Sequence, residues 1–339
     1  MSITDDAAET SEHLTFETAR AVLAAYDLPS DARLVSLGSG NNTTFQVTAD
    51  GTRYVLRVHR PGYRTAANIR AELHYLQRLR AVLDGTVVQV PQPVPCRDGR
   101  LVVEAGLRYC DLLTWLDGHV LVPGQGLGPH GVHDLGHTLG RLHNAAELIG
   151  PQFDGELPSW DADGMFVPAA SPFRPVLELD EILSENDRPL FDEIADRTRT
   201  IFDVLNRDGA YGIIHADYIL GNVFLRRQAD GWQTGVFDFD DCGFGYYLYD
   251  LCPLLGNLAG YPGAILDNPY YPALREAFLD GYRTIRSLPR EWDRHLPVLM
   301  AARQANHCLL TARPDVSPTP RHDAAWRMSL ARRCLALAA

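Results

Sequence analysis

Three oxygen-bearing side chains are spaced as phosphoryl transfer would require. Asp217 and Asn222 lie five residues apart in the run HADYILGN (215–222), and Asp238 follows in the run FDFDD (237–241). Such a reaction needs a carboxylate to accept the proton of the attacking hydroxyl and oxygen ligands to hold Mg²⁺. A short loop can turn Asp217 and Asn222 to one side, and two returning strands can bring Asp238 beside Asn222. The spacing therefore predicts one carboxylate for the nucleophile and an Asn–Asp pair for a metal ion.

The half of the chain that carries these motifs is predicted to be mainly helical, with short strands next to the motifs. Apolar residues at helical period alternate with brief apolar runs, and a Gly- and Pro-containing stretch at 151–176 predicts a loop. The predicted strands are 213–214, 223–225 and 235–239, and the predicted helices lie at 133–147, within 178–207 and from Tyr247 onward.

The first half predicts a small antiparallel sheet with helices. Tight turns at 38–42 and at Asp50-Gly51 join a three-strand meander. The predicted helices are 14–27 and 66–83, the predicted strands are 34–37, 43–48, 53–59, 101–105 and 108–115, and 87–95 is a connection. Because this run ends at Asp117-Gly118, we place a boundary there, between an N-terminal lobe, 1–116, and a C-terminal lobe, 117–339.

The composition narrows the range of partners. The 339 residues are 46% hydrophobic and 22% charged, which is typical of a globular protein with two domains or two lobes. A net charge of −12 disfavours nucleic acid and membrane surfaces as partners. It is compatible with a cationic substrate, although solubility alone also explains it. No apolar run approaches membrane-spanning length. The six cysteines form no C-x-x-C pair and the N-terminus is acidic, so we expect reduced thiols and a cytoplasmic protein.

The motif region resembles a known family. The segment IIHADYILGNVFL…GVFDFDDCGFGYYLYDL is similar to the aminoglycoside phosphotransferase/choline kinase-type family, and within it to homoserine-kinase-like and stress-response Ser/Thr kinase-like proteins. The resemblance implies an α+β, two-lobed, protein-kinase-like fold with a small antiparallel-sheet N-lobe and a mainly helical C-lobe. It also implies an ATP- and Mg²⁺-dependent kinase that phosphorylates a small-molecule hydroxyl acceptor.

The resemblance also implies roles for individual residues. Asp217 would be the catalytic base, supported in its loop by His215, and Asn222 and Asp238 would bind Mg²⁺. Further residues that match the family pattern are Asp250, expected to anchor the loop backbone, and His143 in LGRLH (139–143), expected to be a packed residue. The family commonly has Gly at Ala216 and Leu at Tyr218. Neither change removes a catalytic oxygen, and the Tyr218 change bears on the acceptor site.

Nucleotide-binding residues are expected in the first half. The turn holding Gly38, Ser39 and Asn42 can direct backbone amides at phosphate, as in kinase-like lobes. Arg57 matches the family's ATP-contacting lysine, and all 31 basic residues of this chain are arginines, so only an arginine can serve. Its fork suits the α- and β-phosphates. Glu72 on the next helix resembles the partner acid. The hinge whose backbone would meet adenine is TWLDG (114–118), with Trp115 and Leu116.

The acceptor leaves alternatives open. Residues 178–193 carry seven acidic side chains against Arg188, which predicts either a solvated helix face or a cleft wall that attracts a cationic alcohol. A Ser/Thr protein kinase of the same fold would differ only in its acceptor. A nucleotide-binding regulator without turnover remains open because arginine replaces lysine. A metal-dependent hydrolase built on 238–241 would bind metal without nucleotide.

Overall fold

The computed structural model describes residues 15–40, 42–121, 127–206, 210–228, 231–260 and 268–336. The chain folds as two compact units. The first unit comprises Met1–Ala81 and Val90–Asp117, and the second comprises Val82–Gln89 and Gly118–Ala339. The sequence analysis divides the chain after residue 116 and does not single out Val82–Gln89. This segment groups with the second unit because its strand β4 pairs with β11 there.

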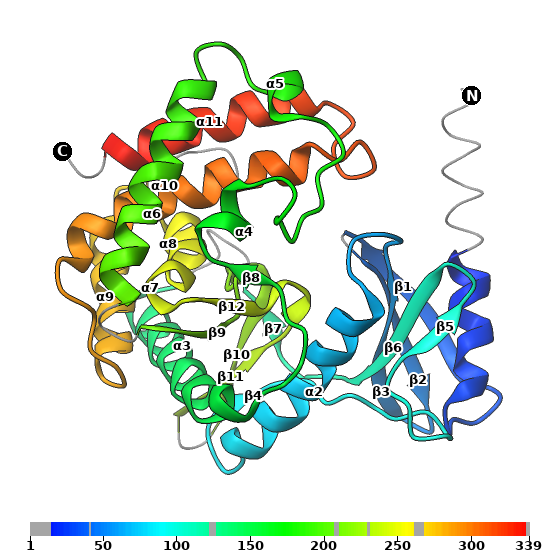
Figure 1. The fold of residues 1–339 in the computed structure, drawn as a ribbon. Helices are drawn as coiled ribbons and strands as arrows, with labels where there is room; N and C mark the ends of the chain where they lie inside the picture. Colours follow the sequence, from blue (N-terminus) through cyan, green and yellow to red (C-terminus); the bar gives the residue numbers. More distant parts are fainter. Residues whose placement is uncertain are drawn as a thin grey trace. The chain divides into compact units, whose positions relative to one another are not determined.

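The first unit is a five-stranded antiparallel sheet in the order β1-β2-β3-β6-β5 (Figure 1). Its strands are β1 Arg33–Ser39, β2 Asn42–Ala49, β3 Thr52–His59, β5 Val103–Ala105 and β6 Arg108–Thr114, and its helix α2 covers Ala66–Leu83. The predicted three-strand meander and the predicted helix at 66–83 are thus confirmed. Asp50 and Gly51 have φ of 48° and 76°, the left-handed pair that a two-residue hairpin requires.

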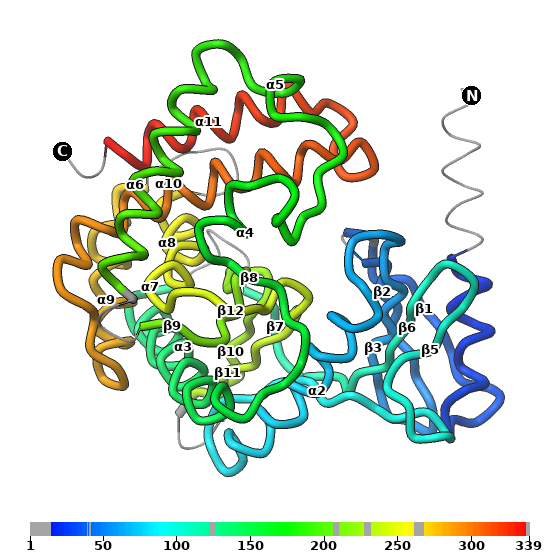
Figure 2. The backbone as a smooth tube through the Cα atoms, in the orientation of Figure 1, coloured from blue at the N-terminus to red at the C-terminus, as the bar shows by residue number. Residues whose placement is uncertain are grey.

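A helix at 15–22 and a 3₁₀ turn at Leu23–Ala25 pack on this sheet, at its side in Figure 2. Their apolar side chains share a core with alternate residues of the strands, as the period of two in a strand predicts. The fully or nearly buried members are Ala19, Val22, Tyr26, Phe45, Val47, Leu56, Val58, Cys96, Cys110 and Leu112. The helix predicted at 14–27 is confirmed from Thr15 onward, and Leu14 lies outside the described residues.

The second unit is mainly helical and holds two small sheets, β4-β11-β10-β7 and β8-β12-β9. Its strands are β4 Val88–Gln89, β7 His119–Val120, β8 Ser159–Trp160, β9 Tyr211–Ile214, β10 Val223–Gln228, β11 Gly231–Val236 and β12 Gly243–Tyr246. Its helices are α3 Pro129–Ile149, α4 Ala162–Phe166, α5 Leu179–Ile182, α6 Arg188–Asn206, α7 Tyr247–Asp250, α8 Cys252–Ala259, α9 Tyr271–Arg283, α10 Trp292–Thr311 and α11 Pro320–Ala336.

Helices α3 and α9 pack closely because each offers a glycine at their contact. A side chain at Gly136 would meet the carbonyl oxygen of Phe278 at 1.9 Å, and one at Gly281 would meet that of His133 at 1.9 Å. This close contact brings His143 of α3 within hydrogen-bonding distance of Tyr282 of α9.

Three predictions of local structure are wrong. The stretch 151–176, predicted to be a loop, contains β8 and α4. The strand predicted at 235–239 ends at Val236, and a 3₁₀ turn begins at Phe239. The connection at 87–95 contains β4. Tertiary pairing decides each case: β8 pairs with β12, and the indole N–H of Trp160 donates to the carbonyl oxygen of Asp241 at 2.8 Å.

Two bulk features accompany this fold. All six cysteines are buried and unpaired. Within the described ranges, every helix is too short or too polar to cross a lipid bilayer.

Candidate active site

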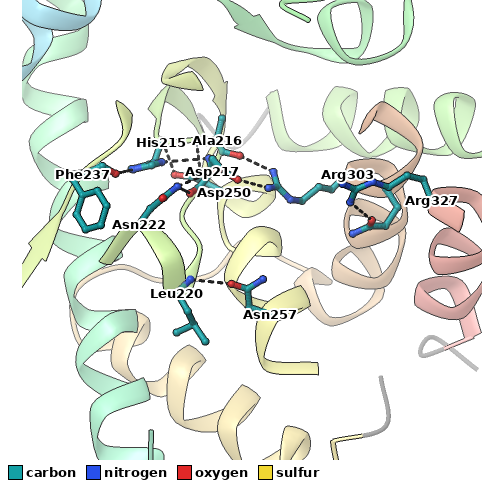
Figure 3. A network of polar contacts seen from close by, with 11 residues as sticks. His215, Ala216, Asp217, Leu220, Asn222, Phe237, Asp250, Asn257, Arg303 and Arg327 are labelled. Atoms are coloured by element: carbon teal, nitrogen blue, oxygen red, sulfur yellow. Dashed lines mark hydrogen bonds and ion pairs between the residues drawn. The ribbon is translucent and has the colours of Figure 1, made fainter. Parts of the chain in front are cut away.

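The loop that carries Asp217 is held by the carboxylate of Asp250, the last residue of α7 (Figure 3). Oδ2 of Asp250 accepts the backbone N–H of His215 at 2.9 Å, and Oδ1 accepts that of Ala216 at 2.7 Å. The Nε2 atom of His143 lies 3.0 Å from Oδ2, and its Nδ1 lies 2.8 Å from the hydroxyl of Tyr282. The predictions that Asp250 anchors the loop backbone and that His143 is a packed, hydrogen-bonded residue are therefore confirmed.

Burial and hydrogen bonding set the charges of this pair. Burial alone would raise the pKa of Asp250, but the hydrogen bond from His143 outweighs it and holds that pKa below its usual value. Burial lowers the pKa of His143. Near neutral pH the carboxylate is therefore charged and the imidazole is neutral, donating from Nε2. A charged carboxylate is the stronger acceptor for the two backbone N–H groups.

The loop turns sharply at Ala216. This residue has φ of 63°, in the left-handed region that favours glycine, the residue the family commonly has there. Tyr218, two residues later, is fully buried, and its hydroxyl donates to the carbonyl oxygen of Leu135 on α3 at 3.0 Å. The expectation that Tyr218 shapes the acceptor site is thus wrong, because its side chain fills the interior against α3.

Both carboxylate oxygens of Asp217 have a polar neighbour. Asn222 donates from Nδ2 to Oδ2 at 2.9 Å and to the backbone oxygen of Asp217 at 3.0 Å. Arg303 of α10 donates from Nη2 to Oδ1 at 2.5 Å (Figure 3). The side chain of Asp217 is still 25% exposed. The carboxylate is thus fixed in direction yet open to a bound molecule.

His215 contacts the backbone of both motif loops. Its Nδ1 accepts the backbone N–H of Asp217 at 3.3 Å, and its Nε2 lies 3.1 Å from the carbonyl oxygen of Phe237. These partners place the proton on Nε2, and burial lowers the pKa of His215, so the ring is neutral. With 3% of its surface exposed, His215 orients the loops and does not reach a substrate.

The β10–β11 hairpin brings the two expected metal ligands to neighbouring positions. Val223 pairs with Val236, and the N–H of Phe237 donates to the carbonyl oxygen of Asn222 at 3.0 Å, so Asp238 follows beside Asn222. Asn222 directs its amide nitrogen at Asp217, which leaves its amide oxygen facing away from that carboxylate. One amide oxygen and one carboxylate are the donors that Mg²⁺ accepts alongside phosphate oxygens and water. In the described parts of the chain, no three His, Cys, Asp or Glu side chains form a metal cluster of their own.

In the first unit, Arg57 of β3 contacts Glu72 of α2. Nη1 of Arg57 donates to Oε1 of Glu72 at 2.7 Å, and the two residues are 4% and 3% exposed. The structure thus brings together the basic residue and the acid that the family pattern pairs.

Sequence reasoning missed Asp111, which lies opposite Arg57 in the β3–β6 register. Arg57 donates from Nε to Oδ1 at 2.9 Å and from Nη2 to Oδ2 at 3.0 Å, and Nε2 of His59 lies 2.5 Å from Oδ2. Burial alone would raise the pKa of Asp111, but Arg57 and His59 outweigh it and lower that pKa. A guanidinium fork can serve Asp111 and Glu72 together, whereas an ammonium has no such planar pair of donors. The available signal was a lone carboxylate within the apolar strand at 108–115.

The remaining nucleotide residues lie at the ends of strands. Gly38 has φ of 135° at a bulge in β1, Ser39 pairs with Thr43, and Asn42 begins β2. The N–H of Gly40 donates to the carbonyl oxygen of Asn42 at 2.9 Å, so this amide is used inside the turn. Asn41 lies outside the described residues.

At the expected hinge, the N–H of Trp115 donates to the carbonyl oxygen of Arg53 at 3.3 Å. The guanidinium of Arg53 lies 4.8 Å from the centre of the indole ring and pairs with Asp117. Leu116 follows Trp115 and is half-buried. The adenine contact stays a prediction for both Trp115 and Leu116.

Sequence reasoning also missed Arg303, which lies 86 residues after Asp217. Nothing in the spacing of α10 distinguishes Arg303 from the other arginines of the chain. Its contact with the motif loop depends on how α10 packs in the second unit.

Comparison with known proteins agrees with this geometry. A model of the phosphotransferase enzyme family matches residues 31–297. The chain belongs to this family. A homoserine kinase of Neisseria meningitidis serogroup B is 29% identical, with 84% of each chain covered. The structure of a microcompartment-associated aminopropanol kinase is 26% identical, with a TM-score of 0.70 over 95% of this chain and 96% of that one.

A further member of the family shares the fold. An amicoumacin kinase in complex with AMP-PNP, Ca²⁺ and Ami has a TM-score of 0.66 and 18% identity, covering 98% of this chain and 96% of that one. The predicted protein-kinase-like fold and the family resemblance are thus confirmed. As a member of the phosphotransferase enzyme family with kinases as relatives, the chain is an ATP-dependent phosphotransferase that acts on a hydroxyl group.

Proposed function

We propose that this chain transfers the γ-phosphate of ATP to the hydroxyl of a small molecule, with Asp217 as the base. The observation that carries the proposal is the arrangement around Asp217. Its carboxylate is fixed by Asn222 and Arg303 while a quarter of the side chain stays exposed. A base must lie within hydrogen-bonding distance of the proton that it accepts, and each carboxylate oxygen has a second lone pair to offer.

We assign Mg²⁺ binding to Asn222 and Asp238. Mg²⁺ would neutralise the charge of the β- and γ-phosphates and orient them. Asn222 then has two tasks, because its amide nitrogen holds Asp217 and its amide oxygen is left for the metal. This places the base and the metal ligand on one short loop, which supports a fixed distance between nucleophile and phosphate.

On the nucleotide side, Arg57 is the residue that we assign to the α- and β-phosphates. Asp111 and Glu72 take three of its five N–H donors, which leaves two for phosphate oxygens. Two buried carboxylates around one guanidinium make a rigid cation, and a phosphate would add to these contacts without replacing them.

For the acceptor, the relatives named above act on homoserine, aminopropanol or amicoumacin. A small alcohol is therefore the class that we propose here. The acidic run at 178–193 pairs partly with nearby arginines: Arg188 contacts Asp180 and Asp192, all of them well exposed. These contacts support the interpretation of that run as a solvated surface.

Calorimetry of ATP binding, with and without Mg²⁺, tests the metal assignment. We expect Asp238→Ala and Asn222→Ala to remove most of the Mg²⁺-dependent gain in ATP affinity. Asp196→Ala, which deletes a carboxylate of α6 that is 81% exposed, is the matched control and should bind as the wild type does. Equal Mg²⁺ dependence in all four proteins would overturn the assignment.

A further inference from the structure

We propose that Arg303 is a positioning residue that holds the carboxylate of Asp217 in its reactive direction. The proposal rests on the assignment of Asp217 as the base. Arg303 lies in α10, far from both motifs in the sequence, and reaches the motif loop with its side chain (Figure 3). Its Nη2 donates to Oδ1 of Asp217 at 2.5 Å, and its Nη1 donates to the carbonyl oxygen of Ala216 at 2.8 Å.

The two contacts act on different parts of the loop. One fixes the side chain of Asp217, and the other fixes the backbone at Ala216, the residue with positive φ that turns the loop. The planar guanidinium joins the two acceptors rigidly, so the carboxylate cannot rotate without breaking a charge-assisted hydrogen bond. With Asn222 on the other oxygen, the plane of the carboxylate is defined from both sides.

Burial makes this contact selective. Arg303 is 9% exposed, and burial alone would lower its pKa, but the carboxylate of Asp217 outweighs this and raises it. The neighbouring arginine of α11, Arg327, donates to Oε1 of Gln304 at 3.1 Å (Figure 3). Burial and the charge of Arg303 lower the pKa of Arg327 to about 10. Two cations thus lie close together, and Asp217 is the carboxylate that Arg303 contacts.

Arg303 keeps the base in place, and we expect its loss to slow the transfer step more than nucleotide binding. Misplacing a reacting group by about 1 Å can cost roughly 100-fold in rate. We therefore expect Arg303→Met to lower kcat by roughly 100-fold with the KM for ATP little changed. Arg303→Lys keeps the charge but cannot make both contacts in one plane, so we expect an intermediate kcat.

The chain offers a matched control in Arg313, which follows α10. Arg313 is 6% exposed, contacts the carboxylate of Asp315 through Nε at 3.1 Å and Nη2 at 2.9 Å, and donates to the carbonyl oxygen of Phe173 at 3.3 Å. Burial and partners thus resemble those of Arg303, but none of these partners belongs to the motif loops. Arg313→Met should lower thermal stability as Arg303→Met does and leave kcat unchanged.

The experiment measures kcat, KM for ATP and melting temperature for the wild type, Arg303→Met, Arg303→Lys and Arg313→Met, with the acceptor that the wild type phosphorylates. Guanidinium chloride at low millimolar concentration is then added to each variant. We expect it to restore part of the rate of Arg303→Met and to leave Arg313→Met unaffected, since a guanidinium ion can refill only the first gap usefully. A kcat of Arg303→Met equal to that of Arg313→Met would overturn the proposal.

Two further outcomes are also decisive. If Arg303→Met does not fold, Arg303→Lys takes its place, and a wild-type kcat in that variant overturns the proposal. Failure of the underlying assignment looks different: Asp217→Asn would then retain the wild-type rate. An inactive Asp217→Asn beside an Arg303→Met of wild-type kcat would contradict the role of Arg303 alone.

Discussion

Asp250 is placed to support the loop of Asp217 without reaching a substrate, and three donors depend on its carboxylate. It accepts the N–H groups of His215 and Ala216 and the imidazole N–H of His143, all in an interior that water does not reach. The sequence predicts this anchoring role from the family pattern. It could not supply the third donor, because His143 meets Asp250 only through the packing of α3.

Replacing Asp250 by alanine should therefore cost both stability and activity. Two buried N–H groups lose their acceptor, and each such loss costs about 1 to 3 kcal/mol. We expect the free energy of unfolding to fall by about 3 kcal/mol or more, as urea denaturation would measure. The melted loop would also lower kcat. A variant of wild-type stability would contradict the anchoring role.

At the scale of elements, patterns that depend on local sequence were predictable and those that depend on pairing were not. The hairpins at 33–59 and the helix α2 follow from turn residues and apolar period, and the sequence predicts them. The two-residue strands β4, β7 and β8 have no signal of their own, because a distant partner strand defines each. The same holds for Asp111 and Arg303, which contact the predicted site residues through β6 and α10.

The pairing of β3 with β6 gives a test of why this chain uses arginine. In Arg57→Lys, the ammonium cannot serve Asp111 and Glu72 with one planar fork, so a buried carboxylate loses part of its compensation. We expect weaker ATP binding and a free energy of unfolding lower by roughly 2 kcal/mol. Adding Asp111→Asn should recover part of the lost stability. Arg33→Lys, at an exposed position of β1, is the control and should change neither quantity.

For the whole molecule, three buried histidines make stability depend on pH. Burial lowers the pKa values of His143, His215 and His307 in the folded state, while unfolded histidine titrates near about 6.5. Below about pH 6.5 the unfolded chain therefore binds more protons than the folded one, so stability is lost as pH falls. Each histidine contributes a slope of up to about 1.4 kcal/mol per pH unit.

Urea denaturation at pH 7.5, 6.5 and 5.5 would measure this dependence. We expect the free energy of unfolding to decrease toward pH 5.5. Replacing His307 by leucine, which cannot bind a proton, should make that decrease smaller. A free energy of unfolding that is flat or rises toward acid would show that these histidines are protonated in the folded protein.

The most direct test of the central claim is phosphate transfer by the wild type and by Asp217→Asn. The assay contains ATP, Mg²⁺ and a panel of homoserine, amino alcohols and aminoglycosides, with ADP and the phosphorylated product measured separately. We predict Mg²⁺-dependent transfer to a panel member, and a loss of at least roughly 100-fold in Asp217→Asn with ATP binding retained. An Asp217→Asn variant that transfers phosphate at the wild-type rate would contradict the assignment of the base.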